Sequence, residues 1–136
     1  MGLAEKRLSA AYQKENFPAW KEKLNALVTY ELDFVVAWDE IVKEGFPDAY
    51  PATLDYNFFQ PLFDALTSVC RDDIGRESLQ ATIREIKIGS QRPWSSLQAR
   101  VEGNTLELDA DPTYERTEAA IKDYGDRILK VLEAAL

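Results

Sequence analysis

The side chains of this sequence that could do chemistry are carboxylates and phenols, because histidine is absent and cysteine occurs once. Without histidine, Ser–His–Asp and Cys–His catalysis and His-ligated zinc are excluded. A single cysteine, Cys70, forms neither a thiolate zinc site nor an intrachain disulfide. Its apolar surroundings favour a small core residue over the alternative of a reactive thiol. We therefore expect no bound metal and no cofactor.

One group of acids has the composition of a calcium site but not its spacing. Asp109 and Asp111, with Glu115, could begin an EF-hand loop. Such a loop needs glycine at its sixth position and glutamate at its twelfth, where this sequence has Tyr114 and Ala120. We therefore expect these acids to end a strand and to cap the helix that follows.

Two further short motifs leave more than one interpretation open. Asp72 and Asp73 could form half of a carboxylate pair for acid–base work or magnesium, but the sequence supplies no defined partner, and turn or capping residues are favoured. The Arg92-Pro93-Trp94 motif is either a recognition tip or a place where Trp94 folds over a sheet edge. The glycines match neither of the common phosphate-binding patterns.

Negative charge is concentrated in residues 31–77. This segment holds eleven acids and three bases, so it carries the whole net charge of −8. The aromatic residues Trp38, Phe46, Tyr50 and Tyr56 lie among these acids. Acids with partly exposed aromatics are typical of a surface that binds a basic protein partner. The alternative is that the aromatics belong to the core and the acids only raise solubility.

The same charge argues against two other kinds of partner. A nucleic-acid binder normally has a basic excess, and an anionic membrane surface repels an acidic protein. The longest wholly apolar run, 34–38, is too short to span a bilayer. The N-terminus lacks the pattern of a signal peptide, and one cysteine fits a reducing compartment, so we expect a cytoplasmic protein. The oligomeric state does not follow from the sequence.

The spacing of apolar residues defines the elements that must position these groups. In chain order, it predicts helices over 3–15 and 17–28, a strand within 31–38, a helical turn over 39–44, an irregular loop over 46–54, helices over 57–70 and 76–82, and a strand region from Ile83. Asn57 is the expected N-cap of the helix over 57–70.

The clearest local signal is a hairpin over 96–102 and 105–109. Gly103-Asn104 suits a two-residue turn, which pairs the strands so that apolar residues share one face. The buried face is predicted to comprise Leu97, Ala99, Val101, Leu106 and Leu108, with Arg100 opposite Glu107 on the other face. A final helix over 113–136 is predicted to open at Asp111-Pro112 and to pack on the apolar face.

These elements predict a single α+β domain over residues 1–136, in the order α-α-β-α-α-β-β-β-α. Strands joined by short turns favour an antiparallel sheet of three to four strands. The helices are expected on one face, because the other face of the hairpin is polar.

We favour a non-catalytic protein-binding or interaction module with an acidic, aromatic-containing surface. The residues expected at the partner are Trp38, Asp39, Asp48, Tyr50, Asp55, Tyr56, Arg92 and Trp94. The alternative is a small histidine-independent enzyme that uses carboxylates and tyrosine in a cleft between sheet and helices. An enzyme needs a concave pocket with converging groups of shifted pKa, whereas a binding module needs an exposed charged patch.

Overall fold

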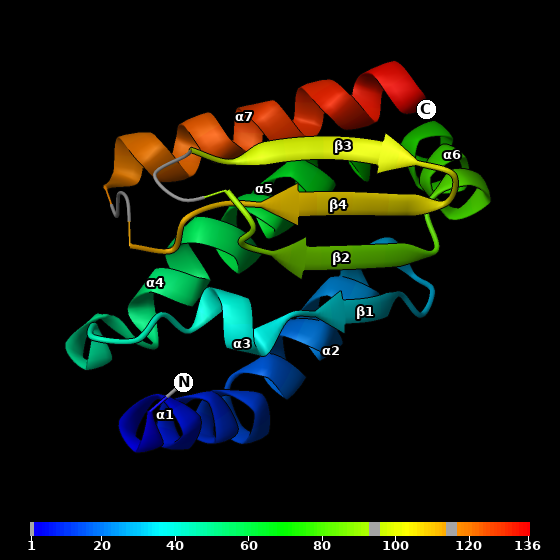
Figure 1. Cartoon of the computed structure of the whole chain (residues 1–136). Coiled ribbons are helices and arrows are strands. Elements are labelled where there is room, and N and C mark those ends of the chain that lie inside the picture. Colours follow the sequence, from blue (N-terminus) through cyan, green and yellow to red (C-terminus); the bar gives the residue numbers. More distant parts are fainter. Residues whose placement is uncertain (1, 93–95, 114–116) are drawn as a thin grey trace.

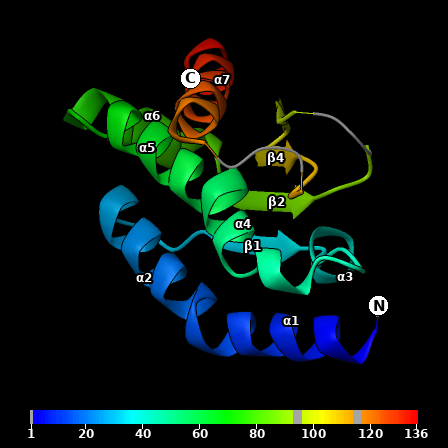
Figure 2. The same ribbon diagram turned by 90° about the vertical axis from the view of Figure 1, so that its left-hand side faces the viewer.

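The computed structural model describes residues 2–92, 96–113 and 117–136. Its elements are α1 (Leu3–Glu15), α2 (Phe17–Val28), β1 (Asp33–Val36), α3 (Trp38–Ile41), the 3-10 helix η1 (Pro47–Ala49), α4 (Ala52–Leu54), the π-helical turn η2 (Asp55–Phe59), α5 (Gln60–Val69), α6 (Asp73–Thr82), β2 (Glu85–Gly89), β3 (Gln98–Glu102), β4 (Thr105–Asp109) and α7 (Glu118–Ala135). The predicted α+β class is confirmed. Figure 1 shows the four strands side by side, and the side view in Figure 2 places α2 and α5 on one face of the sheet.

The sheet is mixed, which corrects the antiparallel sheet predicted from the sequence. The strand order is β1-β2-β4-β3, and only the β3–β4 pair is antiparallel. The long helical connection through α5 and α6 returns the chain to the same end of the sheet, so β2 runs parallel to β1. β3 takes the outer edge, and the hairpin folds back so that β4, with buried Leu106 and Leu108, lies beside β2.

The predicted hairpin and its register are confirmed. Ala99 pairs with Leu108, and Val101 pairs with Leu106. Gly103 adopts a φ of 61°, which the tight turn requires and which glycine adopts without strain. Leu97, Leu106 and Leu108 are buried as expected, whereas Ala99 and Val101 are only half-buried. The difference arises because β3 is an edge strand.

Three helix starts differ from the prediction, and one of them is that of α6, which begins at Asp73 and not at Arg76. The helix expected from Asn57 already begins at Ala52, and α4, η2 and α5 follow one another without a break. Asn57 therefore lies inside the helix, where its side-chain Nδ2 donates to the carbonyl oxygens of Thr53 (2.8 Å) and Pro112 (3.0 Å). The last helix starts at the N-cap Thr117, whose hydroxyl accepts from the backbone N–H of Ala120 (3.1 Å), and not at Asp111-Pro112.

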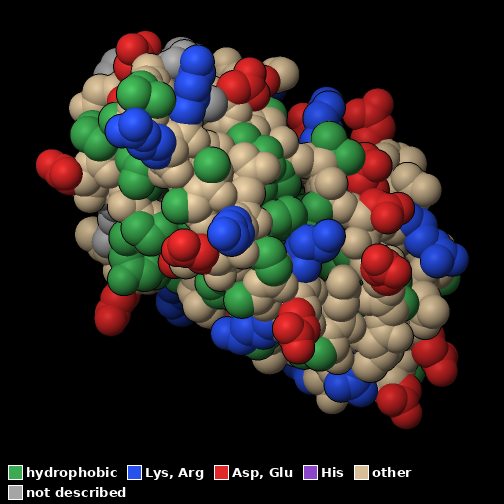
Figure 3. All heavy atoms as spheres, turned by 90° about the horizontal axis from the view of Figure 1, so that it is seen from below, with side chains coloured by type: hydrophobic (Ala, Val, Ile, Leu, Met, Phe, Trp, Pro, Cys, Tyr) green, Lys and Arg blue, Asp and Glu red, His purple; other side chains and the backbone are tan. Residues whose placement is uncertain are grey.

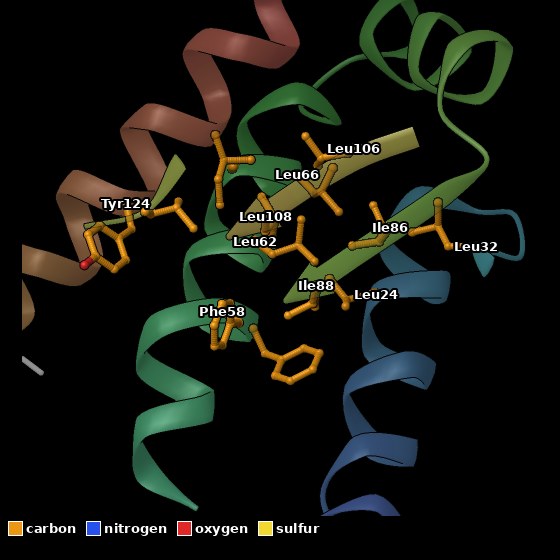
Figure 4. Close-up of a cluster of buried hydrophobic side chains, with 14 of the residues drawn as sticks. Leu24, Leu32, Phe58, Leu62, Leu66, Ile86, Ile88, Leu106, Leu108 and Tyr124 are labelled. Atoms are coloured by element: carbon orange, nitrogen blue, oxygen red, sulfur yellow. The ribbon is translucent and has the colours of Figure 1, made fainter. Parts of the chain in front are cut away.

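A cluster of buried apolar side chains joins the sheet to the helices that cover it. Figure 4 shows Phe58, Leu62 and Leu66 of the η2–α5 segment facing Ile86 and Ile88 of β2. Cys70 is 2% exposed and belongs to this cluster, which confirms the prediction of a core residue. Within the described ranges, no helix combines the length and apolar character needed to cross a bilayer.

Candidate functional site

The candidate site is built on the segment that joins β1 to α4, and its centre is the loop of residues 42–51, called here the 42–51 loop. Tyr50 anchors the base of this loop through its hydroxyl group. Its hydroxyl accepts from the backbone N–H of Lys43 (2.7 Å) and donates to the carbonyl oxygen of Ile41 (2.8 Å). Tyr50 is only 8% exposed, and its burial raises the pKa of the phenol. Tyr50 therefore positions the loop and does not offer its ring to a partner.

A carboxylate from the first helix fixes the far side of the same loop. Oε1 of Glu5 accepts a hydrogen bond from the backbone N–H of Gly45 at 3.0 Å. This bond is the main reason why the pKa of Glu5 lies below its usual value. Gly45 has a φ of 89°, so a residue with a side chain would be strained at this tie point. The loop is thus attached to α1 as well as to its own base.

The outer side of the loop presents one apolar ring among acids. Phe46 is 48% exposed, and Asp39, Glu44 and Asp48 are exposed as well. Lys43 is the only base between residues 31 and 70. It is half-buried, and its ammonium donates to the carbonyl oxygen of Ser90 at 3.4 Å. This contact directs the ammonium at a backbone carbonyl at the end of β2.

Asp55 and Trp38 form the support of this surface. Oδ1 of Asp55 accepts hydrogen bonds from the Tyr12 hydroxyl (2.7 Å) and from Nε1 of Trp20 (2.9 Å). These bonds tie η2 to α1 and α2. The half-buried ring of Trp38 packs against Tyr12, with centroids 5.7 Å apart, and against Phe17, with centroids 5.1 Å apart. Both residues hold helices in place, whatever else they contact.

The neighbouring Tyr56 differs from these supports, because its ring is 43% exposed on η2. It was predicted at the partner surface, and the structure leaves its ring accessible. Arg92 follows β2 and is exposed, with Nη1 donating to Oε1 of Gln98 at 3.1 Å. Trp94 lies outside the described residues, so both interpretations of the Arg92-Pro93-Trp94 motif stay predictions.

The alternative function as an enzyme requires a cavity in which reactive side chains converge. A small cavity of about 110 Å³ between α1 and residues 50–54 is lined by Tyr12 and Tyr50, with Glu15 and Asn16 beside apolar side chains. Burial raises the pKa of both Tyr12 and Tyr50. A phenol with a raised pKa stays protonated at neutral pH, and this disfavours its use as a general base. The cavity therefore lends no support to the tyrosine chemistry of the enzyme alternative.

The other acidic candidates have local structural partners. Asp72 is the N-cap of α6 and accepts from the N–H of Gly75 (2.8 Å), as the capping interpretation predicts. Oδ2 of Asp109 accepts from the N–H of Gln91 (3.0 Å). Oδ1 of Asp111 accepts from the N–H and hydroxyl of Thr113. In the described part of the chain, no three acidic or cysteine side chains gather as metal ligands would.

Sequence reasoning missed the two ties that shape the site. The partner of Glu5 is a backbone N–H 40 residues away, and no side-chain pattern reveals such a partner. The bond between Tyr12 and Asp55 spans 43 residues, so it has no signal in the neighbouring sequence either. The sequence around Phe46 does indicate that this residue is exposed. Gly45 and Pro47 on either side of it interrupt helices and favour a surface loop.

Comparisons with models of known families, with curated proteins and with solved structures find no significant match. The function is therefore argued from the geometry of the chain itself.

Proposed function

We propose that the chain is a non-catalytic binding module that holds a basic protein partner against the 42–51 loop and α3. The observation that carries this proposal is the exposed Phe46 ring on a loop whose backbone is fixed by Glu5 and Tyr50. A loop that is ordered before binding loses less entropy when the partner docks. An accessible aromatic ring among acids combines an apolar anchor with electrostatic attraction.

The residues of the module divide into two roles. Phe46, Asp39 and Asp48 are the contact residues, with Tyr56 as a further accessible ring. Tyr50, Asp55 and Trp38 hold the surface from within, as described above. On the face seen in Figure 3, Lys and Arg are interspersed with acids rather than gathered in one patch, so that face does not suggest an acidic partner.

The test is an affinity capture at low salt from a lysate of the source cells, with three immobilised proteins. The first is the wild type, and the second carries Asp39→Lys, Glu44→Lys and Asp48→Lys. Asp55 is left unchanged, because replacing it would remove the bonds to Tyr12 and Trp20. The third, a matched control, carries the same change in net charge at exposed acids outside the site, namely Asp64→Lys, Glu77→Lys and Glu133→Lys.

We expect a basic protein to be retained by the wild type and the control and to be lost with the Asp39/Glu44/Asp48 variant. Phe46→Ala should weaken retention without a change in charge, since it removes the proposed anchor. Circular dichroism should show the same fold for every variant. Equal retention of one partner by all the proteins, or retention of no basic protein, would contradict the proposal.

A further inference from the structure

The two edges of the sheet are finished differently. At the β3 edge, α7 packs alongside, and Nη1 of Arg127 donates to the carbonyl oxygen of Leu97 (3.2 Å) and to the Ser96 hydroxyl (3.3 Å). β3 also carries charged Arg100 and Glu102 on its exposed face. At the other edge, β1 is the outermost strand in Figure 1, and β2 is its only strand partner in the described part of the chain.

The hydrogen bonds to β2 show which backbone groups of β1 remain unpaired. The N–H of Asp33 donates to the carbonyl of Arg84 (2.9 Å), and the N–H of Ala37 donates to the carbonyl of Ile88 (2.9 Å). Because the N–H and C=O groups of successive strand residues alternate in direction, those of Phe34 and Val36 point away from β2. Among the described residues, none forms a hydrogen bond with these outward backbone groups.

β1 is only four residues long and carries Asp33, but it lacks several of the features that protect natural edge strands. Lysine, proline and bulges are common protections, and residues 33–36 contain neither lysine nor proline and pair with β2 without a bulge. Val35 is 48% exposed on the face of the sheet opposite the helices. Its register partner on β2, Lys87, is exposed as well. The strand therefore offers both backbone groups and an apolar side chain to an added strand.

Charge indicates what kind of strand fits this edge. Glu31 and Asp33 are exposed at the start of β1, and Asp39 is exposed in α3 directly after it. A lysine- or arginine-containing segment complements these acids. A second copy of β1 would instead bring the same acids together, and like charges next to each other are destabilising.

We propose that the β1 edge binds an extended basic segment of the partner, which adds to the sheet as a fifth strand. The N–H and C=O groups of Phe34 and Val36 supply the main-chain hydrogen bonds, Val35 packs against an alternate side chain, and the flanking acids pair with lysine or arginine. This inference rests on the proposed function and extends it, because β1 leads directly into α3 and the 42–51 loop.

The probe is a synthetic peptide with blocked ends in which lysine and valine alternate along one face, with threonine at the positions between them (Lys-Thr-Val-Thr-Lys-Thr-Val), because Asp33 and Val35 share one face of β1. One control peptide has glutamate in place of lysine. A second has the same sequence with backbone N-methylation at every residue, which keeps the charge and removes the hydrogen-bond donors along both edges. Binding is followed by NMR, with hydrogen exchange of the Phe34 and Val36 amides as the main readout, because strand addition protects them directly.

We expect the lysine/valine peptide at saturation to slow exchange of the Phe34 and Val36 amides about tenfold or more. The N-methylated and glutamate peptides should bind at least about tenfold more weakly. Val35→Lys should weaken binding of the basic peptide more than Val35→Glu does, because both changes remove the apolar contact and only lysine also adds like charge. Circular dichroism checks that both variants fold.

Absence of binding, binding without protection of the two amides, or equal binding of the N-methylated peptide would overturn the inference. The two proposals fail separately. Retention of a basic protein that depends on Phe46, with no protection at β1, leaves the proposed function standing. Protection at β1, together with native capture that is indifferent to Asp39, Glu44 and Asp48, would instead refute the loop as the contact surface.

Discussion

Single carboxylates tie distant parts of this protein together at the residue scale. Asp55 accepts two hydrogen bonds on one oxygen, from Tyr12 and Trp20. Glu5 accepts one from the N–H of Gly45. In both cases the acid lies on one element and its donors lie on others, so the carboxylate fixes how these elements sit against each other. Neither acid could be assigned this role from its sequence neighbours.

Asp55→Ala should lower the free energy of unfolding by about 2 kcal/mol, because it leaves the Tyr12 hydroxyl and the Trp20 indole N–H without their acceptor. Asp55→Asn keeps a carbonyl oxygen at the same position and should cost about 1 kcal/mol, since only the charge is lost. Urea unfolding of the wild type and both variants measures the difference. Equal stability of all three proteins would show that these bonds contribute nothing net.

The lowered pKa of Glu5 makes a pH-dependent contribution to stability. The folded-state pKa lies below the ordinary value of 4.5, so the contribution is fully present above that value and is lost as the pH falls through the folded-state pKa. Glu5→Gln should therefore be less stable than the wild type at pH 7, and the gap should narrow toward pH 2. Glu22→Gln, an exposed change of the same charge, is the control in urea unfolding at each pH.

At the scale of elements, two glycines in packed helices have different surroundings. A Cβ at Gly125 of α7 would lie 3.6 Å from the Pro61 carbonyl oxygen and 3.8 Å from Cβ of Asp64, both ordinary contacts with α5. A Cβ at Gly75 of α6 would overlap the carbonyl oxygen of Val69. Only Gly75 is therefore required by close approach, and Gly125 is replaceable.

Gly125→Ala should raise the free energy of unfolding by about 0.5–1 kcal/mol, because alanine has the higher helix propensity and the added methyl group fits. Gly75→Ala should lower it, because the backbone must move to relieve the overlap. Thermal unfolding of the two variants measures both effects. A loss of stability in Gly125→Ala would mean that the α5–α7 contact is tighter than these distances indicate.

The elements also show where sequence reasoning succeeds and where it stops. The β3–β4 hairpin follows from alternation of apolar residues and the Gly103-Asn104 turn, both local signals. The parallel β2–β4 pairing depends on which strand of the hairpin takes the inner position, and no local pattern decides that. The acidic, proline-containing sequence around Tyr50 predicted an exposed residue. In the structure, its hydroxyl instead forms hydrogen bonds with backbone groups at the base of that loop.

Stability should be unevenly distributed over the whole molecule. β2 and β4 are paired on both sides, and their apolar residues Ile86, Ile88, Leu106 and Leu108 are at most 1% exposed. We expect the amides of these two strands to exchange most slowly in native-state hydrogen exchange, because they open only on global unfolding. The amides of α1 should exchange faster, because much of that helix is exposed. Equal protection of α1 and the central strands would contradict this.

The aromatic cluster behind the 42–51 loop also gives the protein an optical property. The cluster includes Phe17, Phe59, Trp20 and Trp38, so it holds two of the three tryptophans of the protein. The indole N–H of Trp20 donates to the carboxylate of Asp55. Indole emission responds to hydrogen bonding and to solvent, so any partner that displaces α1 or η2 changes the fluorescence spectrum. With Trp94→Phe, both remaining emitters would report from behind the proposed contact surface, and binding could be timed without attaching a dye.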